Sequence, residues 1–356
     1  MLNLLGLINM EEAKRRRPNA VGVNPCAEIL LDSKGVCNLT TINIKAFVKE
    51  DSEGNKYLDK EGLLDAQRLS ARIGVRMTLV TLELDEWDAN QKRDRLIGTS
   101  MTGLQDALEI LEYTTEDEIK LLNELRDASR EEADRYAGEL RITRPLLATT
   151  VKPEGTLSQV FGGVSPGVHN SHSPYYIRRV RVNANDPLAK VAKDLGWSIH
   201  AEVGTNGKYT EEELAEEEQV ETAQTLVIGF PIKSGAKKTK DDITVDDQFD
   251  LYFRFQKEYT EHNTSNTITV RPDEWGQAER RVWDGWDDFV GVSFLSHDGG
   301  SYTLAPYTAI EEEEYEEMKK DMKAFNPELL RKYEESETEA DMENMDSCEG
   351  GTCPIR

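Results

Sequence analysis

Three side chains that could do chemistry together stand near the start of this sequence. Asn24, Cys26 and Glu28 place a thiol between an amide and a carboxylate, each two residues away. Pro25 disfavours a helix on the N-terminal side of the thiol. Because alternate side chains of an extended or looped segment point the same way, we expect these three groups to face one small molecule together.

The four cysteines of the chain, Cys26, Cys37, Cys348 and Cys353, lie in pairs near its two ends. This is sparse for the disulfide framework of a secreted protein and suggests intracellular redox chemistry. None of the five histidines stands beside a cysteine pair at zinc-finger spacing, so we expect no metal site. Residues 336–356 are rich in Glu, Ser, Asp, Met and Gly, which predicts a mobile tail that carries a swinging dithiol.

Composition excludes several classes of function. The chain has 43 Lys and Arg against 68 Asp and Glu, a net charge of −25, whereas nucleic-acid binding requires clustered cations. No segment approaches the roughly 20 apolar residues of a membrane span. The apolar start, residues 1–10, has neither a cationic region before it nor a cleavage-like site after it. We therefore expect a cytoplasmic protein that binds neither nucleic acid nor membrane.

Strands that alternate with helices must position these groups. Helical spacing of apolar residues predicts helices over Leu63–Leu84 and Glu116–Leu140. Apolar and β-branched runs predict strands at Arg95–Met101, Leu146–Val151, Tyr175–Val182, Thr225–Ile232, Asn266–Arg271 and Gly291–Ser296. The alternation indicates parallel βα units.

A polar turn follows the strand predicted at Leu146–Val151. It consists of Pro153, Glu154, Gly155, Thr156, Leu157 and Ser158. Backbone N–H groups and the positive end of a following helix make such a turn a natural anion site. An ordinary strand-to-helix turn with a Ser or Thr cap explains the same residues, so both interpretations stay open.

Several motifs, taken in order, resemble the ribonucleotide reductases. Asn24–Glu28 with Gly35–Leu39 resembles their finger loop, here residues 20–40. The spacing from Cys26 to Cys37 resembles the adenosylcobalamin-dependent, class II branch. Further segments that resemble the same branch are Ile97–Leu104, Lys152–Thr156, Ser173–Arg179, Val270–Trp275, Ser293–Tyr302 and the pair Cys348 and Cys353.

This resemblance implies a fold and a reaction. The fold would be α/β, the second half of a ten-stranded reductase barrel over residues 1–335, with a central finger loop and a disordered redox tail over 336–356. The reaction would be reduction of ribonucleoside di- or triphosphates to 2′-deoxyribonucleotides for DNA precursor synthesis, by thiyl-radical chemistry with adenosylcobalamin as cofactor.

The resemblance also implies a role for each candidate residue. Cys26 would become the thiyl radical that abstracts the ribose 3′ hydrogen, Glu28 would be the general base for the 3′-hydroxyl, and Asn24 would bind the ribose hydroxyls. Cys37 would be one member of the dithiol that reduces the 2′ position. The turn Pro153–Ser158 would hold the substrate phosphate.

The tail cysteines complete the implied cycle. Cys348 and Cys353 would re-reduce the active-site disulfide and pass the oxidation to a thioredoxin- or glutaredoxin-like reductant.

One departure from the family matters. The family's partner thiol for Cys37 lies before the finger loop, and no cysteine precedes Cys26 here. We therefore expect the chain to need a separate N-terminal reductase half and to be inactive alone. Two alternatives stay open: a class I large-subunit fragment served by a radical-donating subunit, and a non-catalytic remnant that acts as a binding partner. The late region Val290–Tyr307 lacks the adjacent tyrosines of class I, which favours cobalamin.

Overall fold

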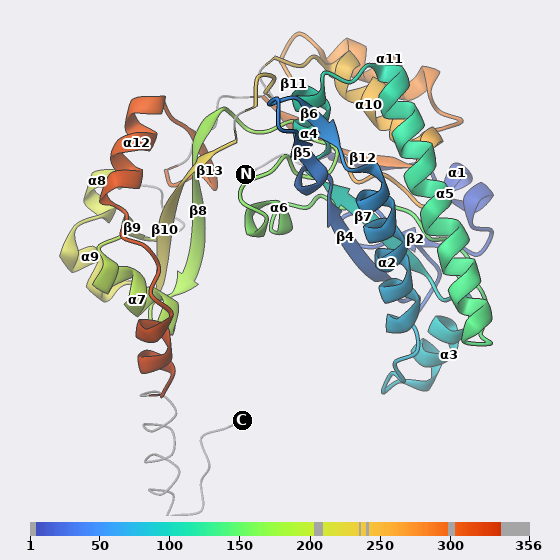
Figure 1. Ribbon diagram of the computed structural model, residues 1–356, viewed down its shortest axis with the longest axis horizontal. Coiled ribbons are helices and arrows are strands. Elements are labelled where there is room, and N and C mark those ends of the chain that lie inside the picture. The colour runs from blue at the N-terminus through green and yellow to red at the C-terminus, as the bar shows by residue number, and fades with distance from the viewer. Residues whose placement is uncertain (1–4, 203–208, 235, 240–241, 298–302, 336–356) are drawn as a thin grey trace, which may run out of the picture. The chain divides into compact units, whose positions relative to one another are not determined.

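The computed structural model describes residues 5–202, 209–234, 236–239, 242–297 and 303–335. Its contacts divide the chain into two compact units (Figure 1). The first consists of Met1–Pro174 and Ser234–Gly299, and the second of Tyr175–Lys233 and Gly300–Arg356. Residues of the range 1–335 thus fall in both units, and the predicted division at residue 335 stays a prediction.

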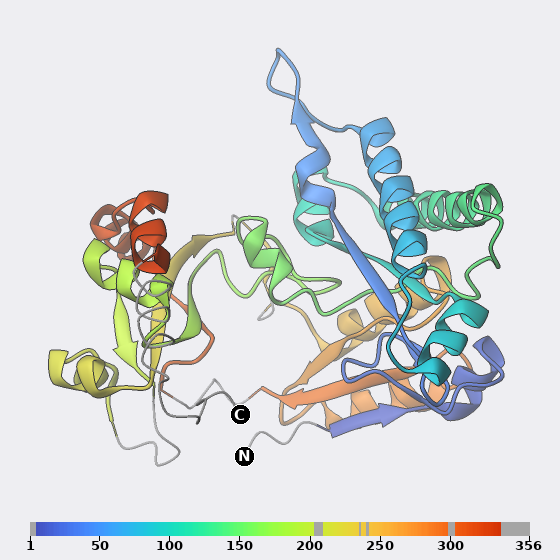
Figure 2. The ribbon, with the colours of Figure 1, turned by 90° about the horizontal axis from the view of Figure 1, so that it is seen from below.

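Parallel strands form the centre of the first unit. β4 (Asn38–Asn43) runs parallel to β7 (Ile97–Thr102), and β11 (Thr267–Val270) runs parallel to β12 (Gly291–Ser296). β1 (Leu5–Ile8) pairs antiparallel with β12, and Figure 2 shows the two strands side by side.

Two isolated bridges connect these pairs into one row. Thr99 of β7 bridges Thr149, and Val151 bridges Thr264, both in the parallel sense. The order is therefore β4, β7, the segment around 149–151, the segment from 264 through β11, and β12, with β1 beyond it. Among the described residues β4 has no strand on its other side, so its edge is open.

Helices cover this row. α2 (Lys60–Met77) and α5 (Thr115–Glu139) lie side by side (Figure 1), and their buried residues share cores with β7. Every residue of β7 is buried. A Cβ at Gly98 would lie 2.6 Å from Leu39 Cδ2, so only glycine permits this approach of neighbouring strands.

The remaining elements of the first unit are α1 (Met10–Arg16), β2 (Gly22–Val23), β3 (Leu30–Leu31), η1 (Ile44–Phe47), β5 (Val48–Glu50), β6 (Lys56–Leu58), α3 (Asp85–Asp94), α4 (Leu104–Leu111), α6 (Leu157–Val160), α10 (Val245–Glu258) and α11 (Trp275–Asp284).

Two predicted elements of this unit need correction. Leu146–Val151 is not a regular strand, because its backbone bonds to β7 on one side and to the loop after α10 on the other but forms only isolated bridges, at Thr149 and Val151, instead of a continuous ladder. The helix predicted to reach Leu84 ends at Met77. There the Thr78 hydroxyl donates to the Val75 carbonyl (2.7 Å) and closes the last turn.

The second unit is an antiparallel sheet, which corrects the prediction of parallel units for this region. Its order is β13 (Tyr307–Ala309), β8 (Tyr175–Asn183), β10 (Thr225–Lys233) and β9 (Ile199–Ala201). β8 and β9 point the same way, but β10 lies between them and runs in the opposite direction. β9 is only three residues long, so the strand pattern of the sequence does not include it, and the alternation of longer strands with helices then predicts parallel units. The helices are α7 (Pro187–Leu195), α8 (Glu211–Leu214), α9 (Glu217–Thr222), α12 (Glu312–Asp321) and a helix over 327–335.

Within the part of the chain that the structure describes, no helix has both the length and the apolar character to cross a membrane.

Candidate active site

The predicted finger loop is a tight hairpin. β2 pairs antiparallel with β3, and residues 24–29 connect them. Asn24 closes the connection: its side-chain Oδ1 accepts the Ile29 N–H (2.9 Å), and its carbonyl accepts the Ala27 N–H (2.9 Å). Ala27 has a φ of 62°, in the left-handed region. The loop is therefore a turn rather than an extended segment with simple alternation of side chains.

The two reactive groups of this turn differ in exposure. Cys26 is exposed, whereas Glu28 is only 3% exposed. Partial desolvation and the charge of Glu28 raise the pKa of the Cys26 thiol, and Lys152 opposes them. The thiol therefore stays protonated at neutral pH and keeps the S–H bond that hydrogen-atom chemistry requires.

Glu28 is a buried carboxylate with mixed neighbours. Burial raises its pKa, hydrogen bonding from Asn24 and the charge of Lys152 lower it, and Glu154 raises it further. Its Oε2 is buried without a hydrogen-bond partner among the described residues. A raised pKa and a free lone pair are the properties of a carboxylate that can take a proton near neutrality.

Cys37 lies just before β4 and is half-buried against the core that contains Ile29 and Leu30. Burial and then the charge of Glu28 raise the pKa of its thiol to about 11. Cys26 and Cys37 are both free thiols. The charge of Glu28 thus acts on both thiols, and the catalytic roles of Asn24, Cys26, Glu28 and Cys37 stay predictions.

The predicted phosphate turn adjoins this neighbourhood but contains an unexpected anion. Glu154 has a φ of 58°, and its buried Oε1 accepts the Ser100 hydroxyl (2.7 Å) and the Thr41 hydroxyl (2.8 Å). The Lys152 ammonium lies 3.5 Å from the other oxygen of Glu154. These contacts attach the turn to β4 and β7.

The helix after the turn, α6, has only four residues, and its N-cap, Thr156, makes no side-chain capping bond. Ser158 is buried, and its backbone carbonyl accepts the N–H groups of Gly163 and Val164. One turn of helix has little dipole, so an anion here would depend on backbone N–H groups and on Lys152. Phosphate binding by Pro153–Ser158 stays a prediction.

No sequence motif includes His262 and Asn263, which are wholly buried and bond directly to the finger hairpin. The Asn263 N–H donates to the Glu28 carbonyl (3.1 Å), and its Nδ2 donates to the Ala27 carbonyl (2.8 Å). A histidine and an asparagine side by side between a predicted helix and a predicted strand were the available signal, since loops carry functional residues.

The tail cysteines, Cys348 and Cys353, lie outside the described residues. Among the residues that are described, no group of three or more His, Cys, Asp or Glu side chains could hold a metal ion.

Comparison with known proteins supports the resemblance to ribonucleotide reductases. Residues 8–128 match the family model of the ribonucleotide reductase barrel domain. Adenosylcobalamin-dependent ribonucleoside-triphosphate reductases of Lactobacillus acidophilus and Lactobacillus gasseri are 26% and 27% identical to the chain, over 94% of its length and 45% of theirs. A probable enzyme of the same name from Dictyostelium discoideum is 27% identical, over 94% of this chain and 40% of its own.

Solved structures agree on the fold. A B12-dependent, class II ribonucleotide reductase superposes with a TM-score of 0.74 at 23% identity, over 92% of this chain and 47% of the other. The class Id α subunit of Actinobacillus ureae gives 0.53 at 16% identity, over 83% and 58%. The predicted reductase-type α/β fold is confirmed.

The chain spans a little under half the length of the curated relatives it matches. In motifs, fold and relatives the chain is thus similar to part of a class II ribonucleotide reductase.

Proposed function

We propose that this chain supplies the finger loop of a class II ribonucleotide reductase and, with it, the radical thiol, the general base and one redox thiol. The observation that carries the proposal is the hairpin itself. Cys26 is exposed and protonated, and it stands two residues from Glu28, which is buried and has one oxygen without a hydrogen-bond partner among the described residues. The charge of Glu28 also raises the pKa of the Cys37 thiol.

The residues divide the reaction among them. The Cys26 radical takes the ribose 3′ hydrogen, and Glu28 accepts the 3′-hydroxyl proton. The 2′-hydroxyl then leaves as water, while Cys37 and a second thiol give two electrons and two protons and become a disulfide. The 3′ hydrogen finally returns from Cys26, and Glu28 returns the proton to the 3′ oxygen. Asn24 keeps its Oδ1 on the Ile29 N–H, so its amide N–H₂ is the part that would orient Glu28 and the ribose.

Adenosylcobalamin, when bound, supplies the radical that oxidises the Cys26 thiol. Two features of this chain fit that role: the sulfur is exposed at the tip of the hairpin, and its raised pKa preserves the S–H bond. The relatives that cover 94% of the chain are named as adenosylcobalamin-dependent enzymes that act on ribonucleoside triphosphates, so we infer the same cofactor and a triphosphate substrate.

The remaining parts of the site must come from further protein, which we infer to be an N-terminal reductase half. Among the described residues the parallel row ends at the open edge of β4, and an unpaired edge strand is a ready template for another strand. An exposed thiyl radical would be quenched, so Cys26 also needs cover. The added half would shield Cys26, extend the row and provide the partner thiol of Cys37.

We further infer that Cys348 and Cys353 return electrons to the Cys37 disulfide by thiol exchange and are then reduced by a thioredoxin- or glutaredoxin-like protein. The cytoplasmic location stays a prediction.

The test is reconstitution. The purified chain is assayed for deoxyribonucleotide formation from ribonucleoside triphosphates with dithiothreitol, alone and mixed with its cognate N-terminal half, with adenosylcobalamin or hydroxocobalamin. We expect product only with both protein parts and adenosylcobalamin, and none with Cys26→Ala. If product formation requires a metal-radical subunit instead of adenosylcobalamin, the proposal is wrong and the class I alternative is supported. Binding of the two parts without any product would favour the non-catalytic remnant.

A further inference from the structure

The loop between α10 and β11 lies under the finger hairpin and is built almost wholly of buried polar residues. Thr260, His262, Asn263 and Thr264 are each at most 5% exposed. Buried polar side chains of this density are costly unless each is hydrogen-bonded, so the partners of this loop are informative. Those partners belong largely to the finger hairpin and to the strands beside it.

Asn263 connects the hairpin to β12. Its Nδ2 donates to the Ala27 carbonyl (2.8 Å) and to the Gly291 carbonyl (3.0 Å), and its backbone N–H donates to the Glu28 carbonyl (3.1 Å). Its Oδ1 accepts the Tyr252 hydroxyl (3.0 Å), which fixes the orientation of the amide. The two carbonyls that Asn263 holds lie on either side of the Glu28 Cα, and the first belongs to the residue directly after Cys26.

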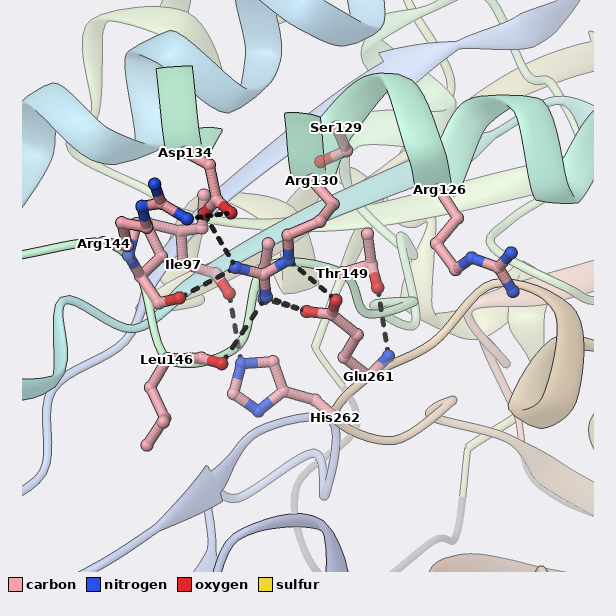
Figure 3. Close-up of polar contacts among 12 residues, drawn as sticks. Ile97, Arg126, Ser129, Arg130, Asp134, Arg144, Leu146, Thr149, Glu261 and His262 are labelled. Carbon is pink, nitrogen blue, oxygen red and sulfur yellow. Dashed lines mark hydrogen bonds and ion pairs between the residues drawn. The ribbon is translucent and has the colours of Figure 1, made fainter. Parts of the chain in front are cut away.

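His262 holds the next residues of the hairpin. Its Nε2 donates to the Ile97 carbonyl of β7 (3.1 Å), as Figure 3 shows, which leaves Nδ1 to accept the Leu30 N–H (3.3 Å). This arrangement requires a neutral ring with the proton on Nε2. A second proton on Nδ1 would remove the acceptor of the Leu30 N–H and would place two hydrogen-bond donors opposite each other.

The loop itself is fastened on its far side. Glu261 pairs with Arg130 of α5 and accepts the Ala148 N–H (2.6 Å), while its own N–H donates to the Thr149 hydroxyl (3.0 Å) (Figure 3). The hairpin is therefore connected through this loop to α5, β7 and β12 rather than by its own short strands alone.

We propose that His262 and Asn263 are positioning residues that hold the Ala27–Leu30 backbone and thereby set the environment of Cys26 and Glu28. Two-residue strands with a six-residue connection have little stability of their own, so the placement of the reactive groups depends on these side chains. The inference rests on the proposed function only for the roles of Cys26 and Glu28 in the reaction. Its test measures the structure of the hairpin and does not measure nucleotide reduction.

The test compares Asn263→Ala with Gln256→Ala in the full chain. Gln256 is the matched control, because it is buried and bonds to Thr264 and to the His262 carbonyl but makes no hydrogen bond to the hairpin. Two readouts are taken under conditions where both variants are folded: hydrogen exchange of the Ile29 and Leu30 amides, and the pH dependence of Cys26 alkylation by iodoacetamide, resolved by peptide mass spectrometry.

For Asn263→Ala we expect exchange at the two amides to rise about tenfold or more over the control, the equivalent of one buried hydrogen bond. The alkylation midpoint should move to lower pH, because a released Cys26 loses the desolvation and the proximity of Glu28 that raise its pKa. If both variants show equal exchange and an unmoved midpoint, the loop only stabilises the fold and the inference is wrong.

If Asn263→Ala does not fold, Tyr252→Phe takes its place, since it removes the hydroxyl that orients the Asn263 amide, together with the acceptor of the Val290 and Gly291 N–H groups. The same two readouts then decide, with a smaller effect in the same direction expected. The failure of this test would leave the reconstitution experiment unaffected, and the failure of reconstitution would leave these readouts interpretable.

Discussion

Acid should destabilise the first unit through His262, and the effect can be isolated by replacing this side chain with glutamine. His262 is completely buried, and desolvation lowers its pKa from 6.5 to about 3. Above pH 6.5 the ring is neutral in both the folded and the unfolded chain, so it adds no pH dependence. Below pH 6.5 the ring binds a proton in the unfolded chain but not in the folded chain. The free energy of unfolding therefore decreases as the pH falls from 6.5 towards 3.

The size of the effect follows from this difference in pKa. Each pH unit below 6.5 should lower the free energy of unfolding by about 1.4 kcal/mol, approaching about 5 kcal/mol near pH 3. His262→Gln removes the titrating group but leaves an amide that can donate to the Ile97 carbonyl. Carboxylates and the other histidines titrate alike in both proteins, so the difference between the two pH profiles belongs to His262.

The assay is urea unfolding at pH 7.5, 6.5, 5.5 and 4.5, followed by tryptophan fluorescence. Four of the five tryptophans, Trp87, Trp275, Trp283 and Trp286, belong to the first unit, so the signal reports chiefly on the part that contains His262. Wild type should lose more stability than His262→Gln from pH 6.5 to 4.5. Parallel profiles would refute the reasoning, because they would mean that the folded protein accepts the proton on this ring.

Three further outcomes are expected. Lys152→Met should raise the pKa of Glu28, so the acid limb of the pH–rate profile of the reconstituted enzyme should move to higher pH; an unmoved limb would show that Lys152 does not act on the base. Cys348→Ser or Cys353→Ser should stop turnover with thioredoxin while dithiothreitol still supports it, and equal loss with both reductants would count against a shuttle. Gly98→Val should lower the free energy of unfolding by about 2 kcal/mol or more in chemical denaturation, because its Cβ has no room between neighbouring strands; a smaller loss would show that the strands can separate.

Much of the fold was predictable because its elements are locally determined. The helix predicted over Glu116–Leu140 forms over Thr115–Glu139, and the strand Gly291–Ser296 has its predicted bounds, since apolar spacing and flanking turn residues define both without outside help. Leu146–Val151 has the composition of a strand as well, but its backbone bonds to a distant loop. The three-residue β9 carries too short a pattern to be recognised, and it decided the antiparallel order of the second unit.

The candidate site also has features that the sequence predicts and features that only the structure shows. Asn24, Cys26, Glu28 and Cys37 lie within fourteen residues of one another, so their types and spacing predict a site around a thiol, and the resemblance of this motif to the reductase finger loop implies radical and redox chemistry. Their environments were not readable. Burial of Glu28, exposure of Cys26 and the raised pKa of Cys37 all depend on groups from other parts of the chain.

The sequence by itself determined which reactive groups this protein carries: a thiol between an amide and a carboxylate, a second thiol after it, and two further cysteines near the far end. Only the tertiary structure decided how that chemistry is held. His262 and Asn263 are more than 230 residues from the hairpin that they support, and the local sequence patterns that identify helices and strands do not reveal such a contact. Hydrogen bonds between distant segments form only when the packed core has brought those segments together, and this is why the support of the reactive loop appears in the fold and not in its motif.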